Sequence, residues 1–341
     1  MNKVTLHDVA KAAGVSIATA SWAINDNKNV RIPAETREKV RKVAEQLGYR
    51  PNALAKGLAQ GISALIGFVT DDVATTPFAG QVIAGAQDEA WRSGRLLLVV
   101  NTDGKESVEK TALKMMMEHQ VDGIIYSTWY HRHVNPPELL LERPSVLVNC
   151  FDEQDLYPAV VPDEVQGGRT ATELLIEAGH RRIAFLNTSS PSPARTGRLE
   201  GYKQALKAAG IAFDSSLVMY VEPNQEGGFN VTNALVDSGA TAVFCHNDRV
   251  AMGLYDGLKE RGLSIPDDMS IVGFDNQEVI SNYLHPALTT VALPHYELGV
   301  LGIRELLKRF NEPDSVTSGR TNPVECPAVV RKSIRKIIKQ N

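Results

Sequence analysis

Long apolar runs, paired cysteines and the apolar core of a secretory signal are all missing from this sequence of 341 residues. No run approaches the roughly 18 apolar residues that a membrane-spanning helix needs. The N-terminus leads directly into a polar, amphipathic stretch, where a secretory signal would place an apolar segment. We therefore expect a cytoplasmic protein with no membrane partner.

Catalytic and metal-binding motifs are missing as well. The three cysteines, Cys150, Cys245 and Cys326, lie far apart and form no C-x-x-C pair, which is typical of reduced, buried thiols in a cytosolic protein. Walker A, G-x-G-x-x-G, G-x-S-x-G and H-E-x-x-H patterns do not occur. We therefore expect no enzymatic activity, no catalytic residue, no metal site and no cofactor.

Charge is distributed unevenly along the chain. The net charge is −4, but residues 1–60 carry ten Lys and Arg against five Asp and Glu. This segment is therefore +5, which leaves −9 on the other 281 residues. A basic head on an acidic body is typical of a nucleic-acid-binding domain fused to a regulatory domain, although solvated basic helices produce the same count. The remaining composition, 43% hydrophobic and 22% charged, is that of a globular chain of two or three domains.

The first fifty residues have the spacing of three short helices. Thr5 can cap a helix whose apolar residues recur at every third or fourth position, and Gly14 can end it because glycine adopts positive φ without strain. Ser16 can cap a second helix that reaches about Asn25, and a third helix ends at Gly48. A helix, a short glycine-containing turn and a second helix form the helix-turn-helix arrangement, whose second helix enters the DNA major groove.

Residues 49–59 follow with a weaker helical pattern. Asn52 can cap one or two helical turns, but so short a helix is marginal in water, and Gly57 weakens it further. We therefore interpret this stretch as a hinge helix that folds on binding, with a plain linker as the alternative.

The rest of the chain alternates short apolar runs with helical stretches. Uninterrupted apolar strands separated by helices indicate parallel sheets that are covered on both faces. The number of expected strands is larger than a single domain usually holds. We therefore expect two α/β lobes with a ligand cleft at the carboxyl ends of their strands. The expected strands include 64–70, 96–101, 123–127, 145–150, 182–187, 218–221, 242–247 and 270–275, and the expected helices include 78–92, 107–120, 165–178, 198–209 and 250–261.

Three local features of the body lead to separate expectations. His131 and His133 are expected in a solvent-facing loop beside two prolines. The three methionines at 115–117 are expected to fill the core. Trp129 is expected either to line the ligand cleft or to make a dimer or loop contact.

These motifs resemble those of the LacI family of repressors, and the likeness extends over essentially the whole chain. The resemblance implies an N-terminal all-α helix-turn-helix domain followed by an α/β, two-lobed, periplasmic-binding-protein-like domain with parallel sheets and three crossovers. It also implies a ligand-responsive, sequence-specific transcriptional regulator, a repressor of carbohydrate-uptake or catabolism genes that binds palindromic double-stranded operator DNA as a homodimer. The stretches that carry the resemblance include T-L-H-D-V-A-K-A-A-G-V-S-I-A-T-A-S at 5–21, L-G-Y-R-P-N at 47–52, A-K-G-L-A at 55–59, V-D-G-I-I at 121–125, N-D-R-V-A at 247–251 and I-V-G-F-D at 271–275.

The resemblance divides the chain into a helix-turn-helix domain at 1–50, a hinge helix or linker at 51–61, and an effector-binding and dimerisation domain at 62–341. The dimer surface is expected to include the region of the 78–92 helix and the hinge. The short basic C-terminal tail lacks coiled-coil heptads, so a dimer is favoured over a tetramer. Lobe 1 is expected to comprise about 62–162 and 293–322, and lobe 2 about 163–292 and 323–341, with chain crossings near 162, 292 and 323.

The resemblance also assigns DNA contacts to the second helix and the hinge. Ile17 and Ala18 can touch only a thymine methyl group, and Trp22 offers a single N–H, so DNA deformability is expected to carry more of the specificity than base reading. Packing of Trp22 against the third helix is an equally weighted alternative. In the hinge, Leu58 matches a leucine that wedges between base pairs in the minor groove. The complete implied set is Thr5, Ser16, Ile17, Ala18, Thr19, Ser21, Trp22, Asn25, Asn52, Ala55, Lys56 and Leu58.

Effector contacts in the cleft are implied in the same way. Arg198 carries a guanidinium fork that suits vicinal hydroxyls or a carboxylate, with a surface salt bridge as the alternative. Asp275 can accept hydrogen bonds from hydroxyls or cap the following turn, and Asn247 can donate and accept. Phe78 can stack on a sugar or belong to the core of its lobe. The implied set is Asp71, Asp72, Phe78, Asn149, Arg198, Asn247 and Asp275.

Polar side chains around an aromatic ring suit a sugar as the effector, with a purine, or no small ligand, as the alternatives. Two other functional classes also stay open: a solute-binding protein of sugar transport without a role in transcription, and a sugar-processing enzyme fused to a DNA-binding head. The missing secretory signal and the helix-turn-helix pattern argue against the first class, and the missing catalytic motifs argue against the second.

Overall fold

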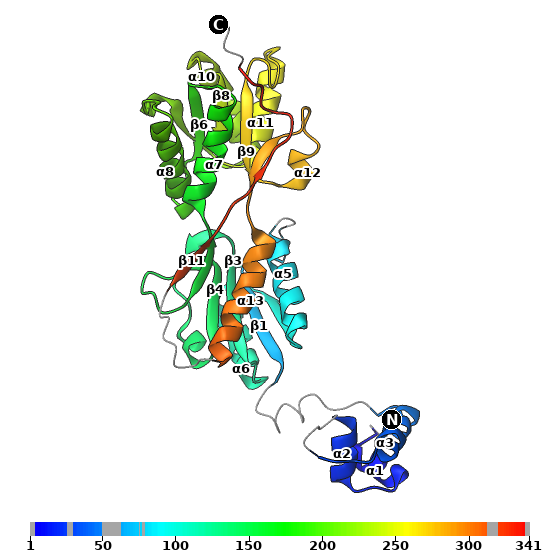
Figure 1. Cartoon of the computed structure of the whole chain (residues 1–341). Helices are drawn as coiled ribbons and strands as arrows, with labels where there is room; N and C mark the ends of the chain where they lie inside the picture. The colour runs from blue at the N-terminus through cyan, green and yellow to red at the C-terminus, as the bar shows by residue number, and fades with distance from the viewer. Residues whose placement is uncertain are drawn as a thin grey trace. The chain divides into compact units, whose positions relative to one another are not determined.

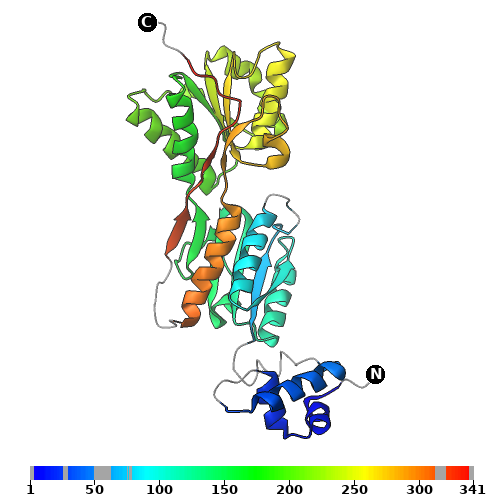
Figure 2. The same cartoon turned by 45° about the vertical axis from the view of Figure 1, so that its right-hand side comes forward.

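The computed structural model describes residues 4–25, 30–49, 63–74, 76, 79–311 and 320–337. The chain divides into two compact units, Met1–Ala64 and Leu65–Asn341. Figure 1 labels the elements of each unit, and Figure 2 gives a second view of them.

Three helices form the N-terminal unit: α1 (Leu6–Ala13), α2 (Ile17–Ile24) and α3 (Ala34–Gln46). Thr5 caps α1 through a capping box with Asp8, and Gly14 ends the helix at φ 67°. Ser16 caps α2 by accepting a hydrogen bond from the Thr19 N–H. The predicted helix-turn-helix and its caps are therefore confirmed. Small side chains let the three helices pack closely, and the buried core consists of Val9, Ala10, Ala13, Ala20, Ala23, Val40 and Ala44.

Two six-stranded sheets form the framework of the C-terminal unit. The first has the strand order β11-β5-β4-β3-β1-β2, and the second has the order β12-β10-β9-β8-β6-β7. Paired strands run parallel in both sheets, apart from β10 and β12, which are antiparallel. The first sheet comprises β1 (Leu65–Thr70), β2 (Leu96–Asn101), β3 (Gly123–His133), β4 (Ser145–Phe151), β5 (Ala159–Pro162) and β11 (Thr321–Val324), and the second comprises β6 (Ile183–Thr188), β7 (Val218–Val221), β8 (Ala242–Cys245), β9 (Ser270–Asp275), β10 (Thr289–Ala292) and β12 (Ala328–Val329).

Helices cover both faces of each sheet, as the uninterrupted apolar strands require. In the first lobe, α5 (Gly80–Arg92) and α13 (His295–Asn311) lie side by side on one face, and α6 (Glu106–Glu118) packs on the other. In the second lobe, α7 (Glu164–Glu177) and α8 (Pro193–Ala208) cover one face, while α10 (Thr232–Asp237) and α11 (Asp248–Glu260) cover the other. Two short helices complete this lobe, α9 (Gln225–Asn230) and α12 (Glu278–Ser281).

The chain crosses between the two sheets three times. It leaves the first sheet after β5 at Pro162, returns after β10 at Ala292, and leaves again after β11 at Val324. The predicted fold class, a helix-turn-helix unit followed by a two-lobed α/β unit with three crossovers, is therefore confirmed.

Strand β3 is longer than the sequence pattern predicts. The expected strand ended at Ser127, but β3 resumes pairing with β4 at Arg132 after a shift in register. An irregularity of this kind hides the second half of a strand from a search for continuous apolar runs. The prediction that His131 and His133 lie in a loop was therefore wrong.

The burial of the methionines in α6 also differs in part from the prediction. Met116 is 1% exposed and packs in the core, but Met115 is 52% exposed, so the expectation of three core methionines was wrong for Met115. Helix α8 begins earlier than expected, because Ser192 caps it and Pro193 occupies its first turn, where the missing N–H of proline costs nothing.

Candidate functional site

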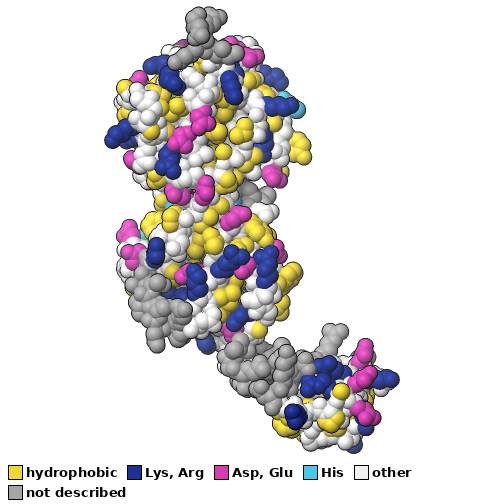
Figure 3. Space-filling view, in the orientation of Figure 1, with side chains coloured by type: hydrophobic (Ala, Val, Ile, Leu, Met, Phe, Trp, Pro, Cys, Tyr) yellow, Lys and Arg dark blue, Asp and Glu magenta, His cyan; other side chains and the backbone are white. Residues whose placement is uncertain are grey.

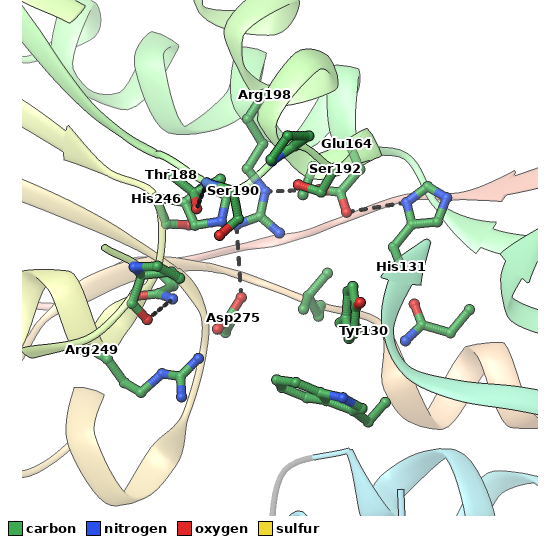
Figure 4. Close-up of a pocket in the computed structure, with 17 residues that line it drawn as sticks. Tyr130, His131, Glu164, Thr188, Ser190, Ser192, Arg198, His246, Arg249 and Asp275 are labelled. Carbon is green, nitrogen blue, oxygen red and sulfur yellow. Dashed lines mark hydrogen bonds and ion pairs between the residues drawn. The ribbon is translucent and has the colours of Figure 1, made fainter. Parts of the chain in front are cut away.

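A cavity of about 310 Å³ in the C-terminal unit is lined by residues of both lobes (Figure 4). The first lobe supplies the end of β3, with Trp129, Tyr130 and His131. The second lobe supplies residues at the carboxyl ends of its strands, such as Thr188 of β6 and Asp275 of β9. The carboxyl ends of parallel strands are where open α/β sheets bind ligands, as the sequence analysis anticipated.

Arg198 lies at the centre of a buried ion-pair cluster in this cavity. Its Nε donates to the Glu164 Oε2 at 2.8 Å, and its Nη1 lies 3.9 Å from the Asp275 Oδ1. Nη1 also donates a hydrogen bond to the carbonyl oxygen of His246. The guanidinium lies 3.6 Å from the ring centroid of Phe274. Because the Arg198 side chain is only 4% exposed, the predicted alternative of a surface salt bridge does not describe it.

The two carboxyl groups of this cluster differ in their pKa values. Burial would raise the pKa of Glu164, but contacts with Arg198 and His131 outweigh burial and lower it to about 2. Burial raises the pKa of Asp275 to about 6, against the opposing attraction of Arg198. Glu164 is therefore ionised over the whole physiological range, whereas Asp275 titrates near its lower end.

The backbone at Asp275 is also unusual. Its φ is 100°, and that of Asn276 is 53°, in the region that favours glycine. Such conformations cost roughly 1–3 kcal/mol each and gather at functional sites. The Oδ2 of Asp275 accepts a hydrogen bond from the Gln277 Nε2 at 2.9 Å, so the side chain also ties down the following turn.

Two helices bring Glu164 and Arg198 together because glycines let them approach closely. A Cβ at Gly197 of α8 would lie 2.6 Å from the Cβ of Glu164, and a Cβ at Gly168 of α7 would lie 2.6 Å from the Cα of Arg198. Neither distance is compatible with a side chain. Gly197 thus permits the close approach of the two helices, and the neighbouring Arg198 forms the ion pair with Glu164.

His131 is the residue that the sequence interpretation placed least well. Its side chain is 9% exposed, and its Nδ1 lies 3.3 Å from the Glu164 Oε1. It therefore links β3 of the first lobe to the start of α7 in the second. Of the two alternatives for Trp129, cavity lining applies, because Trp129 borders the same cavity.

Four of the predicted effector residues line this cavity: Asn149, Arg198, Asn247 and Asp275. All four have internal partners: besides the contacts of Arg198 and Asp275 given above, the Asn149 Nδ2 donates to the Thr128 carbonyl oxygen at 2.9 Å, and the Asn247 Oδ1 accepts from the Val250 N–H at 2.9 Å.

The remaining three predicted effector residues do not line the cavity or lie outside the described residues. Asp71 accepts a hydrogen bond from the Trp129 N–H at 2.9 Å and another from the Arg132 Nη2 at 3.0 Å, so it holds the end of β3 in place. Asp72 does not line the cavity either. Phe78 lies outside the described residues.

Several lining residues were missed by the sequence analysis, namely Tyr130, Glu164, Thr188, Ser190, Ser192, His246 and Arg249. For two of these residues the sequence did contain a signal. Glu164 directly follows the first predicted crossing, and Arg249 belongs to the N-D-R-V-A stretch beside the predicted Asn247.

The predicted DNA-contacting residues of α2 share one exposed face. Ile17 is 51% exposed, Trp22 is 37% exposed, and Ala18 is exposed between them. About a third of the Trp22 side chain is open to solvent, so base reading and packing against the third helix both stay predictions. Of the remaining implied residues, Thr5, Ser16, Thr19, Ser21 and Asn25 are described, whereas the hinge residues Asn52, Ala55, Lys56 and Leu58 lie outside the described residues.

The described part of the chain holds no group of three His, Cys, Asp or Glu side chains that could bind a metal ion. Across the same part, no helix is long and apolar enough to cross a bilayer. All three cysteines are free and buried, and burial raises the pKa of the Cys150 thiol to about 12.

Sequence profiles of two known domains match the chain. The profile described as "Bacterial regulatory proteins, lacI family" matches residues 5–52. The profile described as "Periplasmic binding proteins and sugar binding domain of LacI family" matches residues 63–324. The chain belongs to the LacI family of bacterial regulatory proteins.

Individual LacI-family relatives match over nearly the whole length. The ribose operon repressor of Haemophilus influenzae is 33% identical over 332 residues, which cover 97% of this chain and 98% of that protein. The crystal structure of the lac repressor dimer bound to operator and the anti-inducer ONPF has a TM-score of 0.77 at 27% identity and covers 98% of this chain and 100% of that one. The transcriptional regulator CelR–cellobiose complex has a TM-score of 0.66 at 27% identity, with 97% and 100% covered. The predicted resemblance is confirmed, and with it the interpretation as a transcriptional regulator with a DNA-binding helix-turn-helix.

Proposed function

We propose that this LacI-family regulator represses carbohydrate-uptake or catabolism genes, and that a sugar in the 310 Å³ cavity controls its affinity for operator DNA. The observation that carries the proposal is the lining of the cavity. Hydrogen-bonding side chains of both lobes line the cavity together with Trp129 and Tyr130, a composition that suits a hydroxylated ligand. The names of the ribose operon repressor and of the CelR–cellobiose complex favour a sugar.

A ligand in this cavity would be sensitive to the arrangement of the lobes. Because His131 and Glu164 come from different lobes and meet at the cavity wall, a ligand that contacts both sides binds one lobe arrangement more tightly than another. Differential affinity of this kind is what couples a ligand to a conformational equilibrium. The proposed hinge, residues 51–61, would transmit the change to the DNA-binding unit.

We assign the DNA contacts to the exposed face of α2 and to the hinge. Ile17, Ala18 and Trp22 face the bases, while Thr5, Ser16, Thr19, Ser21 and Asn25 contact phosphates. Asn52, Ala55, Lys56 and Leu58 are assigned to the minor groove of the same double-stranded operator. A palindromic operator follows if the protein is a two-fold symmetric dimer.

We infer a homodimer from apolar side chains at the edge of the first sheet. Leu96 and Leu98 of β2 are 58% and 38% exposed, and Met115 of the neighbouring α6 is 52% exposed. Trp91, in the helix that the sequence analysis assigned to the dimer surface, is 59% exposed. Exposed apolar residues of this density are typical of protein interfaces, and the lac repressor crystallised as a dimer. We also infer that the protein is cytoplasmic and has no enzymatic activity.

A footprinting experiment on the DNA upstream of the protein's own gene tests this function. We expect the full chain to protect a two-fold symmetric site, and to bind it at least about a thousandfold more tightly than unrelated DNA. Affinity should fall steeply as salt rises, because phosphate contacts release counterions. Equal affinity for the upstream and unrelated DNA at every salt concentration would overturn the proposal.

A further inference from the structure

One of the two guanidinium groups that line the cavity forms no ion pair with the carboxylates of the cavity. Among the described lining residues, two carboxylates face two guanidiniums: Glu164 and Asp275 against Arg198 and Arg249. Both carboxylates lie near Arg198, at 2.8 Å and 3.9 Å. The side chain of Arg249 forms no hydrogen bond or ion pair with any described residue, and its Nε is buried without a partner. A buried donor of this kind needs an acceptor, and a ligand in the cavity can supply one.

The position of Arg249 in its helix adds to its positive charge. Arg249 is the second residue of α11, and it lines the cavity together with Asn247, which caps that helix. The N-terminus of a helix carries a partial positive charge and favours anions beside it. Figure 4 shows the Arg249 side chain extending into the cavity. Glu278 and Glu297 line an adjoining hollow that Arg249 also borders, but neither forms an ion pair with it.

Two buried imidazoles provide an independent sign that a ligand belongs in the cavity. His246 is 7% exposed, and its Nδ1 has no partner among the described residues. The Nδ1 of His131 faces Glu164, and its Nε2 likewise has no described partner. Burial lowers the pKa of His246 well below its ordinary value, so the ring is neutral. A neutral imidazole can both donate a hydrogen bond to a hydroxyl group and accept one from it.

We propose that the effector is a polyol that carries one oxyanion group, either a carboxylate or a phosphate. The oxyanion binds Arg249 at the N-terminus of α11, and hydroxyl groups bind His131 and His246. A guanidinium fork binds either oxyanion through charge-assisted hydrogen bonds. The cavity of about 310 Å³ is at the lower end of the range for ligand sites, which favours a monosaccharide derivative. This inference rests on the proposed function, because it concerns the ligand of the same cavity.

A matched ligand panel tests the charge of the effector. The full chain is titrated in thermal-shift and calorimetric experiments with D-glucose, D-galactose and D-ribose, with the corresponding sugar acids, and with the corresponding sugar phosphates. The sugar acids and the phosphates form separate arms, so the result also says which oxyanion is bound. We expect at least one charged derivative to bind about tenfold or more tightly than its neutral parent.

Variants of Arg249 test the proposed contact itself. Arg249→Gln should weaken binding of the charged ligand by about ten- to hundredfold and binding of its neutral parent by less than about threefold, because only the charged contact is lost. Arg249→Lys should restore part of the affinity. Arg195→Gln is the matched control: Arg195 also lies in the first turn of a helix, but it donates to the Ser189 carbonyl oxygen at 2.8 Å and does not line the cavity.

Each other outcome overturns the inference. Equal binding of a neutral sugar and its charged derivative, equal effects of Arg249→Gln on both, or no binding by any charged member of the panel would each contradict it. Operator binding is measured in parallel, so that the two proposals can fail separately. A neutral sugar that changes operator affinity would overturn this inference alone, whereas loss of specific operator binding would overturn the proposed function.

Discussion

The Nε of Arg198 lies 2.8 Å from the Oε2 of Glu164, and both side chains are buried. The two residues are held together by the close packing of α7 on α8, which the glycines of both helices permit. An exposed ion pair contributes little to stability, but removing one partner of a buried pair leaves an uncompensated charge. We therefore expect this contact to affect both the stability of the protein and the pH dependence of that stability.

Glu164→Gln should lower the free energy of unfolding by about 3 kcal/mol, because it leaves the Arg198 charge buried without its main partner. Urea unfolding of the full chain measures the change. Glu305→Gln is the control: it removes the partner of Lys308, whose side chain is 70% exposed, and should cost less than about 1 kcal/mol. Equal costs for the two variants would contradict the account.

The free energy of unfolding of Glu164→Gln should also differ from that of the unmodified chain in its dependence on pH. The pKa of Glu164 is lowered from its ordinary value near 4.5 to about 2 in the folded chain. Its contribution to stability is therefore present above about pH 4.5 and is lost as the pH falls toward 2. Glu164→Gln should flatten the stability curve in that window. An unchanged slope of stability against pH would contradict the assignment.

Asp275→Asn should stabilise the unliganded protein at pH 7.5. The pKa of Asp275 is raised from its ordinary value near 3.8 to about 6, so the folded chain binds more protons than the unfolded chain between these values. Stability therefore falls as the pH rises through this window, by about 2–3 kcal/mol. Asparagine cannot ionise and should avoid this loss, while hydroxyl binding weakens. A lower melting temperature for the variant at pH 7.5 would contradict this prediction.

Gly197→Ala should destabilise the second lobe by about 1–3 kcal/mol, because the new Cβ would lie 2.6 Å from the Cβ of Glu164. It should also displace Glu164 and weaken ligand binding. Gly80→Ala, at the start of α5, is the control, since no heavy atom lies closer than 4.0 Å to its Cβ position. Thermal unfolding of the two variants gives the comparison. Equal melting temperatures would show that the α7–α8 contact tolerates a side chain.

Trp22→Ala should change the preference among operator half-sites without unfolding the N-terminal unit. Trp22 is 37% exposed, so we expect its loss to affect DNA binding, by about 1–3 kcal/mol of discrimination among half-sites. Val40→Ala, in the core, should instead lower the stability of the unit by about 2 kcal/mol. Unchanged half-site preference in Trp22→Ala would remove its reading role.

Local features of the sequence predicted the N-terminal unit well. Thr5, Gly14 and Ser16 act within one turn of their own positions, so the caps of α1 and α2 follow from short-range chemistry. The two α/β lobes were predictable for a related reason, because each of the expected apolar runs coincides with one strand of a sheet.

The wall of the cavity was less predictable, since its contacts join distant positions. His131 and Glu164 are 33 residues apart in the sequence and belong to different lobes. No spacing rule connects them, and the shift in register within β3 concealed the strand that carries His131. Arg198 was identified through the family resemblance, while its pairing with Glu164 depends on helix packing that composition does not reveal.

Basic side chains also occur on the surface of the C-terminal unit, and two of them share an acidic partner. Figure 3 shows Lys and Arg gathered over α5 and α13, and Arg92 and Arg304 of these helices both pair with Glu89. We therefore expect Arg304→Gln to leave operator affinity unchanged in the footprinting experiment. A loss of affinity would add a DNA contact beyond those that we propose for α2 and the hinge.

The central claim is that the cavity between the lobes controls DNA binding. Its most direct test is the operator affinity of the full chain, measured by fluorescence anisotropy with and without the ligand that gives the largest thermal shift. We predict a change in the operator Kd of about tenfold or more at saturating ligand, and a much smaller change in Asp275→Asn. An operator Kd that is the same with the cavity empty and with the cavity saturated would contradict it.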